Sequence, residues 1–312
     1  MKLKEIGEHG FIKDVISRYV STDVNLDVYV HDGIVLKVDG FPISNTLPFM
    51  DLYDIGWKAV VATFSDLISS GSVPKFILSS VGLNPELEVD EAQMLMKGIK
   101  DAADYYESSY VGGDTNSTNG SGWIDIVGCG ELICHDRPKP EPGDIIFITG
   151  KLGYTTNAFL WYTSKGKVPL LNEAKQKLMH PIVNRTLIKL HKKACGVVAF
   201  STDISDGLLV TLKKMINYLG NGVNLHQIPL IDFTQELVDN GTYGIEDILK
   251  FSGEEYETIF VVKKPNSKMF EEIAKSDGLN VIRIGEVIES KSITLNSKML
   301  EIHGWDNFKG WF

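Results

Sequence analysis

Residues 197–210 read VVAFSTDISDGLLV, and this stretch indicates the fold of the chain. An apolar, strand-forming run ends at two acids, Asp203 and Asp206, and a glycine then leads into an apolar segment with helical spacing. A strand followed by polar residues, a glycine and a helix is typical of layered architectures of sheets and helices. An aspartate placed before a helix commonly caps it, so this motif alone leaves a structural role for Asp206 open.

The same succession of strands and helices extends outward along the chain in both directions. We expect a helix within 1–18 and strands at 34–39, 76–83, 124–129, 145–149, 196–200, 258–262 and 281–288. We expect further helices at about 54–71, 89–108 and 182–195, with others beginning near 153 and 207. Residues 40–53 and the serine-, asparagine- and glycine-rich stretch 115–122 read as loops. This pattern predicts an α+β fold built from α/β layers.

A proline-rich segment marks the expected domain boundary. Residues 137–143 read RPKPEPG, and three prolines within five residues favour extended backbone between domains. A chain of 312 residues is also long enough for two domains. We therefore predict an N-terminal domain at 1–136 and a C-terminal domain at 137–312.

The charge of the chain restricts its partners. The 41 acidic residues outnumber the 31 basic ones, which gives a formal net charge of −10. Nucleic acids and anionic membranes attract basic surfaces, so neither is an expected partner, whereas divalent cations are. The N-terminus has no apolar core of a signal peptide, and no run of 18 apolar residues follows. We expect a cytoplasmic protein.

Several well-known catalytic motifs are absent from the sequence. There is no G-x-x-x-x-G-K-[ST] loop, no G-x-G-x-x-G, no G-x-S-x-G and no H-E-x-x-H. These absences argue against a P-loop kinase, a dinucleotide-binding domain, an α/β-hydrolase and a histidine-built zinc site.

Acids that stand at the ends of strands or inside apolar helices are the main chemical signal. Asp66 lies in an otherwise apolar helical segment, where a lone carboxylate is costly if it faces inward. A Mg²⁺ ion would offset that cost, because Mg²⁺ prefers carboxylates, water and phosphate oxygens. Asp39 and Asp114 follow strand-forming residues, and Gly112-Gly113 before Asp114 would let the backbone approach a phosphate. Arg137 is a fixed cation that could reach a polyphosphate. Spacing alone leaves open whether these residues converge.

Read in order, nine segments resemble the thiamine-monophosphate kinases, within the wider aminoimidazole-ribonucleotide synthase-like (PurM-like) superfamily. The strongest matches are Asp54-Ile55-Gly56-Trp57-Lys58-Ala59 with Ser65-Asp66-Leu67, Val111-Gly112-Gly113-Asp114-Thr115, and Asp203-Ile204-Ser205-Asp206-Gly207-Leu208. Others are Arg137 to Asp144, Ile148 to Gly153, His180-Pro181 with Arg185, Gly253-Glu254-Glu255-Tyr256-Glu257, Ile284 to Val287, and Gly304-Trp305 with Phe308. These matches are collinear and cover nearly the whole chain.

The resemblance implies a two-domain PurM-like fold, a homodimer formed through the N-terminal sheet, and a C-terminal α/β domain. It implies transfer of the γ-phosphoryl group of ATP, the co-substrate, to thiamine monophosphate, with several Mg²⁺ ions. By position it implies catalytic roles for Asp66, Asp114 and Asp206, and nucleotide contacts for Gly113, Asp114, Arg137 and Ser205. The implied thiamine contacts are Glu254 and Trp305. The implied metal ligands are Asp27, Asp39, Asp66, Asp114, Asp203 and Asp206.

Four segments depart from the family pattern and keep other interpretations open. The family's S-T-D reads Lys37-Val38-Asp39, its G-D-D-A-A-V is shortened around Asp27, its E-G-V-H-F has no matching histidine, and G-G-E-D-Y is Ser252-Gly253-Glu254-Glu255-Tyr256. Lys37 could supply a fixed charge at a Mg²⁺ position, or the substrate could differ. One alternative is another PurM-like ATP-using enzyme, although a C-terminal cysteine and an early reactive cysteine, which mark two such enzymes, are both missing. The other is a nucleotide-binding paralogue without kinase activity.

Overall fold

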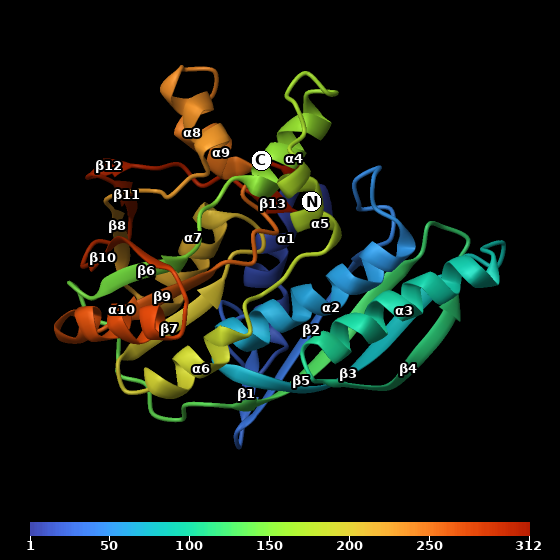
Figure 1. Cartoon of the computed structure of the whole chain (residues 1–312), viewed down its shortest axis with the longest axis horizontal. Coiled ribbons are helices and arrows are strands. Elements are labelled where there is room, and N and C mark those ends of the chain that lie inside the picture. Colours follow the sequence, from blue (N-terminus) through green and yellow to red (C-terminus); the bar gives the residue numbers. More distant parts are fainter. The chain divides into compact units, whose positions relative to one another are not determined.

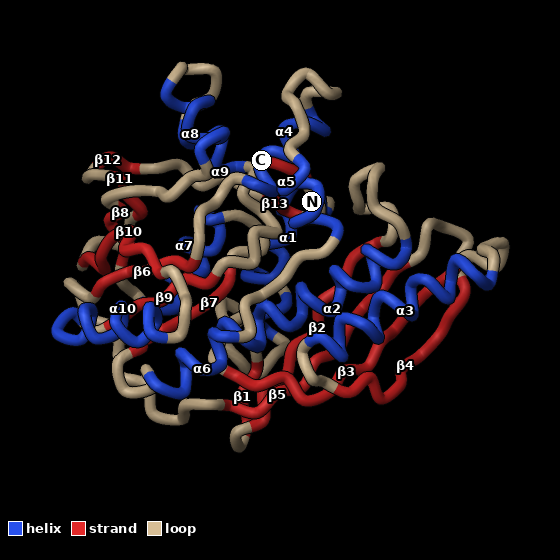
Figure 2. Tube along the Cα trace, in the orientation of Figure 1, coloured by secondary structure: helices blue, strands red, loops and turns tan.

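The computed structural model describes residues 1–312, which group into two compact units. The five-stranded unit contains residues 28–135 and 171–192, and the seven-stranded unit contains 1–27, 136–170 and 193–312. The division after residue 135 lies one residue from the expected boundary, while 1–27 and 171–192 each group with the other unit. Both units combine a sheet with helices, so the expected α+β architecture is confirmed (Figure 2).

The five-stranded unit has the strand order β1-β2-β5-β3-β4. Its strands are β1 (Tyr29–His31), β2 (Ile34–Pro42), β3 (Ser72–Leu83), β4 (Ser109–Ser117) and β5 (Trp123–Leu132). Its helices are α2 (Leu52–Ser69), α3 (Val89–Tyr105), α5 (Asn172–Met179) and α6 (Thr186–Lys193). Only β3 and β4 pair in parallel, and α3 forms the crossover between them. Helices α2 and α3 run side by side along this sheet (Figure 1).

Helix α2 forms where the apolar spacing of the sequence predicts it. The side chain of Asp51 accepts a hydrogen bond of 3.0 Å from the N–H of Asp54, which caps the helix, and Gly71 follows its end at a φ of +83°. Nearly all of α2 is buried, and its apolar residues pack on β2, β3 and β5. Asp66 is therefore an acid within a buried helix.

The two faces of the five-stranded sheet differ in burial. On the face covered by α2, side chains such as Val35, Ile77 and Ile126 are at most 1% exposed. The opposite face is also apolar but open, with exposures of 38–59% for Ile34, Leu36, Val38, Phe76, Leu78 and Val127. A continuous exposed apolar face of this kind commonly marks an interaction surface.

The seven-stranded unit has the strand order β12-β11-β8-β10-β6-β9-β7. The strands are β6 (Ile145–Thr149), β7 (Val198–Asp203), β8 (Gly222–Leu225), β9 (Thr258–Val262), β10 (Val281–Ile288), β11 (Ile293–Leu295) and β12 (Lys298–Met299), and a separate hairpin joins β13 (Trp305–Asp306) to β14 (Gly310–Trp311). The helices are α1 (Leu3–Asp14), α4 (Tyr154–Thr163), α7 (Leu208–Leu219), α8 (Asp232–Asp239), α9 (Ile245–Lys250) and α10 (Ser267–Ser276), with short 3₁₀ turns at Ile16–Arg18 and Lys264–Asn266.

Both faces of the central strands in this unit are covered. On one face, Phe147 and Phe260 each lie with their ring centroids 5.2 Å from that of Phe270 in α10. On the other face, Ile148 and Ile259 belong to a buried cluster that includes residues of α7. This two-sided burial explains why these strands read as continuous apolar runs rather than alternating ones.

Most predicted elements are present, but some predictions are wrong. Residues 109–117, part of which was expected to be a loop, form strand β4, with a register shift that takes up Val111 and Gly112. Helix α6 begins four residues later than expected, and α5, α8, α9 and α10 were not predicted. No helix has the length and apolar composition needed to cross a bilayer.

Candidate active site

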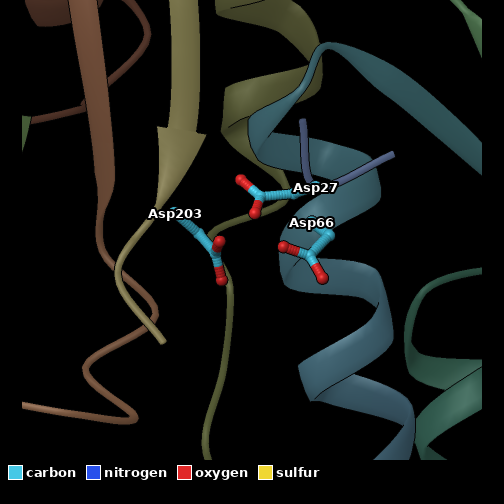
Figure 3. A group of neighbouring side chains, drawn as sticks. All are labelled: Asp27, Asp66 and Asp203. Atoms are coloured by element: carbon cyan, nitrogen blue, oxygen red, sulfur yellow. The ribbon is translucent and has the colours of Figure 1, made fainter. Parts of the chain in front are cut away.

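The seven-stranded unit brings together two of the predicted metal ligands, Asp27 and Asp203. Asp203 ends strand β7 and is only 2% exposed, and a carboxylate oxygen of each residue lies within 4.8 Å of one from the other (Figure 3). The hydroxyl of Thr202 donates a hydrogen bond to Oδ2 of Asp27, which fixes this carboxylate beside the end of β7. Two neighbouring carboxylates with a hydroxyl form an all-oxygen donor set, which suits Mg²⁺ or another hard cation.

The loop that follows β7 is attached by its backbone to both predicted substrate-contacting segments. The carbonyl oxygen of Ser205 accepts a hydrogen bond of 2.7 Å from the N–H of Glu254. The carbonyl oxygen of Asp206 accepts one of 3.0 Å from the N–H of Trp305. Residues separated by about 50 and 100 positions along the chain therefore lie at one loop. Glu254 has a φ of +56°, an uncommon conformation for a side chain and one often found at functional sites.

Two cations contact this loop or the strand that precedes it. Nζ of Lys214, in α7, lies 2.9 Å from Oδ2 of Asp206. Nη1 of Arg137 donates a hydrogen bond of 2.9 Å to Oγ of Ser201 in β7. Burial lowers the pKa of Arg137 to about 10, so its guanidinium remains protonated at neutral pH. The loop and its surroundings thus combine acids with fixed positive charge, as a site for phosphate groups and metal ions requires.

The glycines of residues 149–153 have a packing role. A Cβ at Gly150 would lie 3.0 Å from the carboxylate of Glu257, and one at Gly153 would lie 2.3 Å from Oγ1 of Thr234. The N–H of Gly153 donates a hydrogen bond of 2.6 Å to Oε1 of Glu255. This N–H is therefore already used within the protein. Close packing beside the segment that carries Glu254 therefore accounts for these glycines.

A buried aspartate holds the C-terminal hairpin that carries Trp305. The carboxylate of Asp306 accepts N–H hydrogen bonds of 2.8 Å from Glu8 and 2.9 Å from Phe308. Burial alone would raise the pKa of Asp306, but the N–H groups of Glu8, Phe308 and His9 outweigh it and hold that pKa below its ordinary value. Trp305 is thus positioned by contacts on both sides, from Asp206 and from Asp306.

In the five-stranded unit, Asp66 is paired with a lysine. Figure 3 shows Asp66 on helix α2, and its Oδ2 lies 2.6 Å from Nζ of Lys37 in β2. The two side chains are 4% and 19% exposed, so the pair is largely buried. Lys37 stands where the resembling family has a serine. The charge of Asp66 is therefore met by the chain itself.

Asp39 lies on the same face of β2 as Lys37, since it is two residues away. An acid that was not predicted lies near it. Burial, followed by the charge of Asp39, raises the pKa of Asp125 in β5. Asp125 interrupts the apolar run of its strand, and that interruption is the sequence signal by which it could have been found.

Asp114 is in strand β4, where it aligns with Ser80 of β3, which in turn aligns with Asp125. Aligned residues point to the same face of a sheet, and Asp39 aligns instead with the buried Ile126. Asp114 and Asp39 are therefore on opposite faces. At Gly113, a Cβ would lie 1.8 Å from the carbonyl oxygen of Ser79, so strand packing alone requires glycine there.

Residues 171–192 are attached to α2 and α3 of the same unit. The contacts come from two further family-like motifs, the one at Asp54 to Ala59 and the one at His180-Pro181. Nε2 of His180 lies 2.9 Å from Oδ1 of Asp54, and the indole N–H of Trp57 donates a hydrogen bond of 2.8 Å to the carbonyl oxygen of Pro181. Burial raises the pKa of Asp54, which is 1% exposed. These motifs have a structural role here, as the anchor of a segment on the helical layer.

Two family models match this chain. One, described as AIR synthase related protein, N-terminal domain, covers residues 24–132. The other, described as AIR synthase related protein, C-terminal domain, covers residues 141–298.

Individual relatives match over nearly the whole length. A protein of Aquifex aeolicus named thiamine-monophosphate kinase is 27% identical over 99% of this chain and 100% of its own. One of the same name from Pyrobaculum calidifontis is 27% identical over 98% of this chain and 97% of its own. A solved structure described as AaThiL complexed with AMPPCP and TMP is similar with a TM-score of 0.83 at 25% identity, covering 98% and 99% of the two chains. The resemblance and the two-domain fold expected from the sequence are confirmed.

Proposed function

This chain belongs to the AIR synthase related protein family, and we propose that it transfers the γ-phosphoryl group of ATP to thiamine monophosphate to give the diphosphate. Relatives named thiamine-monophosphate kinase align over almost its full length, and a similar structure holds AMPPCP, an analogue of ATP, together with TMP. We propose the cytoplasm, where ATP and Mg²⁺ are plentiful, as the compartment of the reaction.

The observation that carries this proposal is the loop at residues 203–207. It holds Asp203 and Asp206, and its carbonyl oxygens accept hydrogen bonds from Glu254 and Trp305. We assign the acids to the metal–ATP complex and Glu254 with Trp305 to the thiamine moiety. An acid suits the cationic heterocycle, and an indole can stack on it.

Magnesium fits the residues that are present. Asp27 and Asp203 offer neighbouring carboxylates within the seven-stranded unit, and we propose Asp39, Asp66 and Asp206 as further ligands. We propose Asp114 as a ligand of a separate ion, because it lies on the opposite face of its sheet from Asp39. When bound, Mg²⁺ neutralises the phosphate oxygens of ATP and the charge that develops on them during transfer. The nucleotide contacts that we propose are Gly113, Asp114, Arg137 and Ser205.

The reaction needs no general base from the protein. An oxygen of the acceptor phosphate is already anionic, so it can form a bond to the γ-phosphorus while the bond from that phosphorus to the β–γ bridging oxygen breaks and ADP leaves. The chain's contribution is then to orient the two phosphates in line and to surround them with fixed charge from residues such as Arg137.

We also propose that two copies of the chain pair through the open apolar face of the five-stranded sheet. That face presents Ile34, Leu36, Val38, Phe76, Leu78 and Val127, and a face without charge at its centre is complementary to a second copy of itself. Sedimentation should give a dimer for the wild type and a monomer for Val38→Glu. A wild-type monomer at micromolar concentration would contradict this part of the proposal.

Calorimetric titration with Mg²⁺–ATP and then with thiamine monophosphate tests the function against its alternatives. We expect ATP or its analogue to bind first and thiamine monophosphate to bind the loaded protein. If ATP binds and thiamine monophosphate does not, a related enzyme with another substrate or a paralogue without kinase activity becomes the better reading.

A further inference from the structure

The contact between Lys37 and Asp66 differs in kind from a surface ion pair. Nζ lies 2.6 Å from Oδ2, and the carboxylate side chain is 4% exposed. A carboxylate in such a place is strongly unfavourable unless a cation or several hydrogen bonds offset its burial. The lysine supplies that cation permanently, whatever the concentration of free metal ions.

The surrounding sheet is shaped to bring the lysine to this position. Lys37 aligns with Gly128 of β5, and a Cβ at Gly128 would lie 2.7 Å from Cγ2 of Thr63 and 2.9 Å from Cδ1 of Leu67. Helix α2 therefore packs directly on β5, which leaves the neighbouring strand β2 within reach of Asp66. Lys37 shares its face of β2 with the buried Val35, so its ammonium lies on the side of the sheet that α2 covers.

We propose that Lys37 replaces one divalent cation at Asp66, so that this carboxylate serves at most one metal ion. This inference deepens the proposed function, on which it depends only for the presence of Mg²⁺. The expected consequence is that the chain binds one ion fewer than it would with a neutral residue at position 37. The contact with Lys37 also holds the carboxylate of Asp66 in place before any metal arrives.

The test counts metal ions in purified full-length protein. Mn²⁺, which can be followed by electron paramagnetic resonance, is titrated in the presence of AMPPCP into the wild type, Lys37→Ser, Lys37→Arg and the double variant Lys37→Ser/Asp66→Asn. Lys75→Ser is the matched control, because Lys75 lies on the same sheet in an exposed ion pair with Glu131. Thermal melts with and without Mg²⁺ give a second readout that is independent of turnover.

We expect Lys37→Ser to bind one more Mn²⁺ per chain than the wild type. We expect its Tm to fall by about 10 °C without metal, since a buried charge loses its partner, and to recover most of that loss when Mg²⁺ is added. Lys37→Arg and Lys75→Ser should keep the wild-type ion count. The double variant, which has neither charge, should show no extra ion and little additional stabilisation by Mg²⁺.

An unchanged ion count in a folded Lys37→Ser, or an extra ion in Lys37→Arg, would overturn the proposal. If Lys37→Ser does not fold even with Mg²⁺ while the double variant folds, the lysine has only a structural role and the proposal is likewise overturned. None of these readouts uses thiamine monophosphate, so they remain interpretable if the proposed acceptor is wrong.

Discussion

Two regions of this molecule hold buried aspartates, and each meets their charge differently. In the five-stranded unit, Asp66 faces a lysine ammonium at 2.6 Å. In the seven-stranded unit, Asp27 and Asp203 lie beside each other, and the hydroxyl of Thr202 binds Asp27. The first arrangement pairs one carboxylate with one lysine, whereas the second brings two carboxylates together, and their combined charge favours a bound cation.

This difference indicates where metal dependence should concentrate. Two carboxylates close together repel each other, and that repulsion is relieved when a cation binds between them. A carboxylate already paired with lysine has less to gain from a metal ion. The pair Asp27 and Asp203 should therefore dominate the response of the protein to Mg²⁺, and Asp66 should contribute less.

The largest effect is expected from Asp203→Asn, which changes the pair of aspartates that we expect to depend on metal. Removing one charge from the pair should lower kcat for phosphoryl transfer by about 10²–10³-fold, in the range found when one electrostatic contact to a transition state is lost. Product formation at saturating ATP measures this. Asp232→Asn is the matched control, because Asp232 is almost fully exposed and pairs only with Lys151.

Asp203→Asn should retain the wild-type circular dichroism spectrum, so that lost activity reflects lost chemistry. Activity within a factor of about three of the wild type would remove Asp203 from the site, and with it the central role of this pair.

A smaller effect is expected at Asp306, a buried aspartate whose charge is stabilised in a third way. Its charge is met mainly by backbone N–H groups, and its pKa is held below the ordinary value. A group whose pKa is depressed on folding stabilises the folded state above its unfolded pKa, and this contribution is lost as pH falls through the folded value. Asp306→Asn should cost about 1–3 kcal/mol of unfolding free energy at pH 7.

As pH falls below about 4, the stability difference between the wild type and Asp306→Asn should shrink, and it should vanish only when pH has fallen below the depressed folded pKa, where the wild-type carboxyl is protonated. Denaturant unfolding at several pH values, with Asp232→Asn as the control, measures this. A stability difference that stays constant from pH 7 to pH 3 would assign the loss to packing instead of charge. Mg²⁺ should leave the difference between the two proteins unchanged.

Much of the fold could be predicted because its signals are local. Helix α2 follows from apolar spacing together with a capping aspartate, and strand β6 follows from five successive apolar or β-branched residues. Strand β4 could not be predicted, because glycine, serine and asparagine favour turns, and only pairing with β3 makes this segment extended. Helices α8 and α10 have more polar sequences, and their partners are distant in the chain.

The candidate site shows the same division between local and distant information. The acids at 203 and 206 could be found from their position after a strand, and family motifs added Glu254 and Trp305. Their attachment to one loop depends on backbone hydrogen bonds between distant segments, for which no sequence signal exists. The ion pair of Lys37 with Asp66 also required the structure, although the lysine was conspicuous as a departure from the family pattern.

The most direct test of thiamine-monophosphate kinase activity is to incubate the purified protein with ATP, Mg²⁺ and thiamine monophosphate and to follow the thiamine products by mass spectrometry. We predict a product heavier than thiamine monophosphate by one phosphoryl group, formed together with ADP and absent when either ATP or Mg²⁺ is omitted. ATP consumption without this product, or no reaction from a folded protein that binds ATP, would contradict it.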